Sequence, residues 1–150
     1  MYRKTYKVLG NDVNDYMIME NHAYFSYASR LLDNFLFEKG YSKQKLISLA
    51  IGFQKCTEEL LFQKHLMFTQ RFFVNFECIE ITDNRQKIRV KNSFFNEYNE
   101  LCAIVITKLN WCDINNHKTI TPPRKILEPF FAQQLRLNVH KNISLNIVKD

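Results

Sequence analysis

Two aspartates and one asparagine lie within the four residues from Asp12 to Asp15, just before an apolar helical pattern begins. A carboxylate can activate water or attack a carbonyl carbon, whereas the amide of Asn14 can only donate and accept hydrogen bonds. Glu20 supplies a further carboxylate at the helix start. Since a buried helix needs no carboxylates at its start, we predict that Asp12, Asn14 and Asp15 line a cleft there. The structural alternative is a turn and capping cluster.

The element after this stretch is predicted to be a long helix, from Asn21 to Gly40. Its apolar residues recur at spacings of three and four, and polar residues occupy the opposite face. Asn21 is the expected N-cap, and Gly40 is placed to end the helix in a left-handed conformation. The apolar stripe is wide enough to be covered by a sheet, and it includes Tyr24, Ala28, Leu31, Leu32, Phe35 and Leu36.

Most of the remaining elements are predicted to be strands. A change of phase after Cys78 predicts a β-bulge, and the apolar run at 101–106 predicts a central strand covered on both faces. This order predicts an α+β domain over residues 1–133, in which an antiparallel sheet curls around the long helix. Residues 134–150 form an extension whose spacing fits either a strand or a helix. The other predicted elements are strands at 2–9, 53–62, 72–81 and 88–94, a short helix at 42–49 and a final helix at 124–133.

Composition and charge narrow the classes of protein. The 150 residues carry a net charge of +6, but Lys and Arg are scattered, so a nucleic-acid-binding domain is only a remote alternative. No apolar run reaches the roughly 20 residues of a membrane span, and the opening lacks a signal-peptide core. We therefore expect a cytoplasmic protein. The four cysteines lack metal-ligand spacing and are expected as buried, reduced thiols, with no metal site: Cys56, Cys78, Cys102 and Cys112.

The stretch from Asp12 to Tyr24 has the pattern D-x-N-x-x-M-I-x-E-N-x-x-Y. It resembles D-x-D-x-x-G-H-x-N-N-x-x-Y, the signature of the hotdog-fold acyl-CoA thioesterases of the 4-hydroxybenzoyl-CoA thioesterase type. Asn14 stands at the second Asp of that signature. The resemblance covers residues 2–132. Its further segments are Tyr24–Tyr27 with Y-L-x-Y, Phe62–Phe68 with Y-x-R-P-A-x-F, and Trp111–Asp113 followed by Pro122-Pro123 with V-D-x-x-T-G-x-x-x-x-P-P.

The resemblance implies a hotdog-fold thioesterase that cleaves an acyl-CoA or acyl-carrier thioester to a carboxylate and a free thiol. Coenzyme A is then part of the substrate, and no other cofactor is expected. It also implies a dimer, or a dimer of dimers, with the acyl-CoA at the subunit interface near the N-terminus of the long helix. Helix-start amides would polarise the thioester carbonyl there. The alternative is a hotdog protein that binds an acyl-thioester or a related ligand with little or no turnover.

The position of the family's catalytic carboxylate is occupied by Asn14, whose amide cannot take up a proton. The expected catalytic group is therefore Asn14 together with a neighbouring carboxylate as the source of negative charge. Asp15 is the first candidate because it is adjacent, Glu20 is the second, and Asp12 is a further one. An acyl-lining role and a core role both remain open for the segment 17–19. The expected substrate-binding residues are Met17, Ile18, Met19, Asn21, Tyr24 and Glu58, while His22 is expected at the surface and His65 in a loop.

Overall fold

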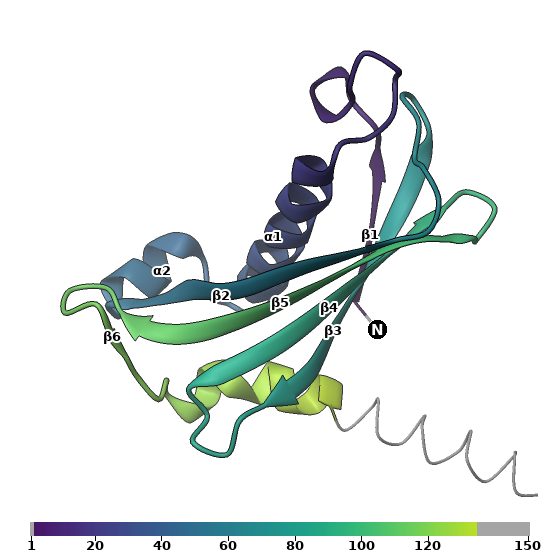
Figure 1. The fold of residues 1–150 in the computed structure, drawn as a ribbon. Helices are drawn as coiled ribbons and strands as arrows, with labels where there is room; N and C mark the ends of the chain where they lie inside the picture. Colours follow the sequence, from purple (N-terminus) through teal and green to yellow (C-terminus); the bar gives the residue numbers. More distant parts are fainter. Residues whose placement is uncertain (1, 135–150) are drawn as a thin grey trace, which may run out of the picture.

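In the computed structural model, which describes residues 2–134, a long helix lies in the hollow of a curled antiparallel sheet (Figure 1). The sheet has the strand order β1-β3-β4-β5-β2, and the two-residue strand β6 pairs with β5. This arrangement confirms the predicted α+β fold. The elements are β1 (Tyr2–Lys7), the 3-10 turn η1 (Gly10–Asp12), α1 (Asn21–Glu38), α2 (Lys43–Ser48), β2 (Ile51–Phe62), β3 (Arg71–Ile81), β4 (Lys87–Asn96), β5 (Leu101–Asp113), β6 (Lys118–Thr119) and a helical segment at 124–134.

The packing of α1 against the sheet is largely aromatic. One face of the helix is buried along its whole length, from Ala23 to Leu36, and its aromatic neighbours in the sheet are side chains of β1, β3 and β4. Aromatic pairs in such edge-to-face and tilted arrangements stabilise a core beyond the area that they bury. The helix is therefore fixed in both position and rotation. Its main aromatic partners in the sheet are Phe94 for Tyr24 (ring centroids 5.1 Å apart), Phe72 for Tyr27 (5.0 Å) and Phe76 for Phe35 (4.7 Å).

The two ends of α1 differ in how well the sequence predicts them. Gly40 has a φ of +93°, as predicted, and the N–H of Tyr41 donates to the carbonyl oxygen of Leu36 at 2.8 Å. The expected N-cap, Asn21, is wrong by one residue. The N-cap is Glu20, which keeps an extended backbone and whose carbonyl accepts from the N–H of Ala23.

Register shifts in the sheet help to set which side chains face the helix. The register between β3 and β4 shifts between Cys78 and Glu80, which confirms the predicted bulge. A second shift, between Lys55 and Thr57, makes Cys56 the extra residue of β2 and explains the irregular alternation of that strand. The apolar run in β5 is not covered on both faces: Val105 is buried, but Ile104 on the opposite face is only half-buried.

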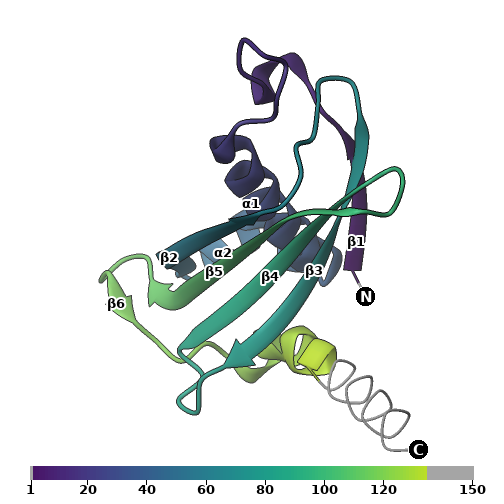
Figure 2. The same cartoon turned by 45° about the vertical axis from the view of Figure 1, so that its right-hand side comes forward.

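The helical segment at 124–134 closes the end of the hollow that lies away from the N-terminus of α1 (Figure 2). Phe130 is fully buried and packs against both Phe35 of α1 and Trp111 of β5, with ring centroids 5.2 and 5.9 Å apart. The amide of Gln133 donates to the carbonyl oxygen of Phe76 and accepts from the N–H of Cys78, where β3 extends beyond its pairing with β1. The predicted extension at 134–150 lies outside the described residues, apart from Gln134, which continues this helix.

The cysteines are less uniformly buried than predicted. Cys78 and Cys102 are buried, but Cys112 is only partly buried, and Cys56 is exposed together with its neighbours in the edge strand β2. All four are free thiols, and the described residues contain no cluster of His, Cys, Asp and Glu that could hold a metal ion. Within residues 2–134, no helix combines the length and the apolar character needed to cross a membrane.

Candidate active site

The loop that precedes α1 is a tight hairpin held by backbone bonds and by one amide side chain. Val13 and Met19 form an antiparallel bridge, and the N–H of Asn14 donates to the carbonyl oxygen of Ile18 at 2.9 Å. The side-chain oxygen of Asn14 accepts from the N–H groups of Tyr16 and Ile18 at 2.9 and 3.2 Å. Both backbone donors hold the oxygen, so the NH2 end of this side chain is the end left to donate to a ligand.

Asp12 connects this loop to the helix. Its Oδ2 accepts from the hydroxyl of Tyr27 at 2.6 Å and from the N–H of Leu9 at 2.9 Å. Its carbonyl oxygen accepts from the N–H of Glu20 at 2.8 Å. Hydrogen bonds to a carboxylate are stronger than neutral ones, so Asp12 is a structural anchor that fixes where the loop meets α1.

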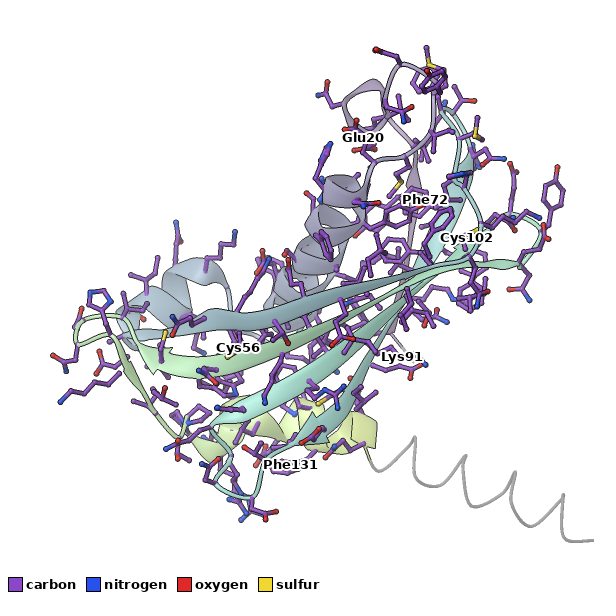
Figure 3. The ribbon with its side chains drawn as sticks, in the orientation of Figure 1. Glu20, Cys56, Phe72, Lys91, Cys102 and Phe131 are labelled. Atoms are coloured by element: carbon purple, nitrogen blue, oxygen red, sulfur yellow. The ribbon has the colours of Figure 1, made fainter. Side chains whose placement is uncertain are left out.

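A cleft of about 490 Å³ opens at the N-terminal end of α1. Three segments form it: the hairpin before α1, the first turn of α1, and the loop that follows β2. The backbone joins these segments, since the N–H of Met19 donates to the carbonyl oxygen of Leu66 at 2.8 Å. Figure 3 shows Glu20 at this end of the helix. The lining residues are Asn14, Ile18, Met19, Glu20, Asn21, His22, Phe62 and His65.

Five of the residues expected in the site share this cleft, namely Asn14, Ile18, Met19, Glu20 and Asn21. Among the carboxylates proposed as a replacement for the family's catalytic Asp, Glu20 is the one in the lining.

The other expected site residues lie outside the lining, each for an identifiable reason. Asp15 is exposed at the hairpin tip, and Met17 has a left-handed backbone with 51% of its surface exposed. Tyr24 is fully buried in the core. Glu58 forms an ion pair with Lys55 at 2.8 Å. The catalytic and binding roles of these residues remain predictions.

The cleft also contains side chains that the expected site did not include. His22 is exposed, as expected, but its Nε2 lies 2.7 Å from Oε2 of Glu20. His65 packs against Phe62, with ring centroids 4.6 Å apart. The i, i+2 spacing of Glu20 and His22 across a helix start was the only sequence signal for the pair. It is weak, because residues two apart usually point in different directions.

The start of α1 favours negative charge in the cleft. The first backbone N–H groups of a helix, here those of Asn21 and His22, have no acceptor within the helix. Together with the helix dipole, they can stabilise an oxygen that gains negative charge. The cleft therefore combines oriented backbone donors, the Asn14 amide, a His–carboxylate pair and an apolar wall. This set of groups is suited to reactions at a carbonyl carbon.

The sequence model of the thioesterase-like superfamily matches residues 8–134. No curated protein matches the chain.

Several solved structures have the same fold. A hypothetical protein from Staphylococcus aureus in complex with CoA is 14% identical, with a TM-score of 0.80 over 88% of this chain and 84% of that one. A gentisyl-coenzyme A thioesterase is 19% identical, with a TM-score of 0.76 over 86% of this chain and 99% of that one. A 1,4-dihydroxy-2-naphthoyl-CoA thioesterase from Synechocystis is 14% identical, with a TM-score of 0.77 over 86% of this chain and 94% of that one. The predicted hotdog fold is thereby confirmed.

The tyrosines that fix the site make stability sensitive to alkaline pH. Burial and the Asp12 carboxylate raise the pKa of Tyr27, and burial raises the pKa of Tyr24 to about 12. Since a free tyrosine has a pKa of about 10, the unfolded chain loses these protons first as pH rises. The free energy of unfolding should therefore be insensitive to both groups below pH ~9 and fall progressively above pH ~10.

Urea unfolding between pH 8 and pH 11.5 measures this dependence. Tyr27→Phe should lower stability at pH 8 by about 1.5–3 kcal/mol, through loss of the bond to Asp12, and should make the alkaline decline shallower. Tyr98→Phe, at an exposed tyrosine, is the matched control and should leave the decline unchanged. An unaltered decline in Tyr27→Phe would show that this hydroxyl does not contribute to it.

Proposed function

Because the chain belongs to the thioesterase-like superfamily, we propose that it hydrolyses an acyl-CoA thioester to a carboxylate and free CoA. The main support for this proposal is the cleft at the start of α1. Asn14 lines it at the position of the family's catalytic carboxylate, beside helix-start donors that can receive the thioester oxygen. Glu20 brings a carboxylate into the same cleft.

The cleft can hold both ends of a thioester. Ile18, Met19 and Phe62 provide an apolar wall for the acyl group, and the first turn of α1 faces the carbonyl. The NH2 group of Asn14 can orient either the thioester or the attacking water. A net charge of +6 favours approach of the negatively charged phosphates of CoA. Structures of the same fold include a complex with CoA and two CoA thioesterases, which supports a CoA ester as the substrate class.

A panel of short, medium, long and aromatic acyl-CoA esters tests the proposal directly. Release of the free thiol should be detected with at least one class, and the KM should rise with salt, since ions screen attraction between exposed charges. The matching measurement is equilibrium binding of the same esters. Binding without thiol release from any ester would instead support the alternative of a ligand-binding protein with little or no turnover.

A second prediction concerns position 14. In Asn14→Asp, one carboxylate oxygen can keep both backbone bonds that now hold the amide oxygen, so the hairpin should stay folded. The other oxygen adds the carboxylate that the family carries there. We expect hydrolysis to become faster, measured as kcat/KM on the best ester of the panel. A slower variant with an unchanged melting temperature would indicate that the NH2 donor matters more than the added charge.

We further propose that the active form is a dimer joined along β2. This strand is 12 residues long, is the last in the strand order, and ends at Phe62 in the cleft wall. A long edge strand with unpaired backbone groups favours pairing with a second copy. Light scattering at micromolar concentration should give twice the 18.0 kDa of one chain, or a higher multiple. A mass of 18.0 kDa would contradict the dimer.

A further inference from the structure

The hydrogen-bonded pair of Glu20 and His22 is the feature of the cleft that the family signature does not explain. Their side chains meet at 2.7 Å between Oε2 and Nε2, and they remain 42% and 63% exposed, so solvent and ligand can reach them. The carboxylate of Glu20 makes no cap bond to the helix backbone, although Glu20 is the N-cap residue. It bonds to the imidazole ring instead.

This bond determines which ring nitrogen can take up a proton. An ionised carboxylate only accepts hydrogen bonds, so the proton of a neutral His22 must sit on Nε2. The lone pair is then on Nδ1, which is available to a water molecule. A carboxylate that holds an imidazole in one tautomer and orientation is the arrangement by which histidine acts as a general base.

The other titratable groups nearby are less suited to this role. Oδ2 of Asp12 already accepts two hydrogen bonds, and Asp15 lies outside the cleft lining. His65, from the loop after β2, packs on Phe62 and has no carboxylate partner among the described residues. The remaining lining residues do not titrate: Asn14, Ile18, Met19, Asn21 and Phe62.

We propose that His22 is the general base of this cleft and that Glu20 is the residue that positions it. The proposal rests on the thioesterase function proposed above and assigns the base that replaces the missing carboxylate at position 14. It places the base on the first turn of α1, next to the backbone N–H groups that would face the thioester oxygen.

The reaction then proceeds in two steps, addition of water and collapse of the tetrahedral intermediate. Nδ1 of His22 takes a proton from water while the water oxygen bonds to the thioester carbon, and the carbonyl electron pair moves onto its oxygen. The resulting oxyanion is stabilised by the amides at the start of α1. Collapse of this intermediate breaks the C–S bond. The sulfur leaves with the electron pair and receives the proton from His22, which gives a carboxylic acid, a free thiol and neutral His22.

The experiment compares the wild-type chain with His22→Ala, Glu20→Gln and the control His117→Asn, an exposed histidine in the turn before β6. On an ester that the wild type hydrolyses, His22→Ala should lose about 10²–10⁴-fold in kcat/KM and lose the acidic limb of the pH profile. Added imidazole should restore part of the rate, since the site is open to solvent. Glu20→Gln should show a smaller loss, and His117→Asn none. Long-range proton–nitrogen NMR spectra of the wild type should show the proton of His22 on Nε2.

The outcomes separate this inference from the proposed function. A wild-type rate and pH profile in His22→Ala would overturn the general base and leave the thioesterase function standing. A proton on Nδ1 of His22 would overturn the pairing with Glu20. A wild type that hydrolyses no ester of the panel would overturn both the function and the base. Loss of activity in His22→Ala without rescue by imidazole, and with a lowered melting temperature, would assign His22 a structural role instead.

Discussion

The fold depends on the burial of one face of α1 in the hollow of the sheet. Bulky aromatic side chains on both surfaces make this packing specific, since removal of a buried aromatic ring typically costs about 3–5 kcal/mol. A rotation of the helix would expose this face, so its axis and its first turn are held in place. The helical segment at 124–134 reinforces the same core at the far end through Phe130. The open end of the hollow is thus left at the start of α1, where the cleft lies.

The polar side chains before α1 have two roles, and different atoms carry out each role. The carboxylate of Asp12 is used to hold the loop against Tyr27, and the oxygen of Asn14 is used to close the hairpin. The turn-and-capping alternative is therefore correct for these oxygens. Asn14 and Glu20 also belong to the cleft lining. The same short segment can build the loop and supply polar groups to the cleft, because each side chain has more than one hydrogen-bonding atom.

The pattern of charges in the cleft differs from that expected of a chain with the full family signature. Because position 14 carries an amide, the negative charge in the cleft comes from Glu20, the N-cap residue, which directly precedes the backbone donors of α1. Glu20 is favourably placed near the positive end of the helix dipole. In the proposed mechanism this carboxylate acts through His22 rather than on the substrate.

The sequence by itself determined the architecture, because hydrophobic periodicity and turn residues act locally along the chain. The stripe of α1, the left-handed Gly40 and the bulge after Cys78 could all be predicted in this way, and the resemblance to the family signature predicted a site at the helix start. Only the tertiary structure decided which polar side chains share the cleft. Asp15 was the first candidate in the sequence and Glu20 the second, but the hairpin turns Asp15 outward, while Glu20, at the helix N-cap, lies beside His22. His65 and Phe62 reach the cleft from more than 40 positions away, through a loop paired to the hairpin. Side-chain direction depends on such long-range contacts, which cannot be derived from local spacing.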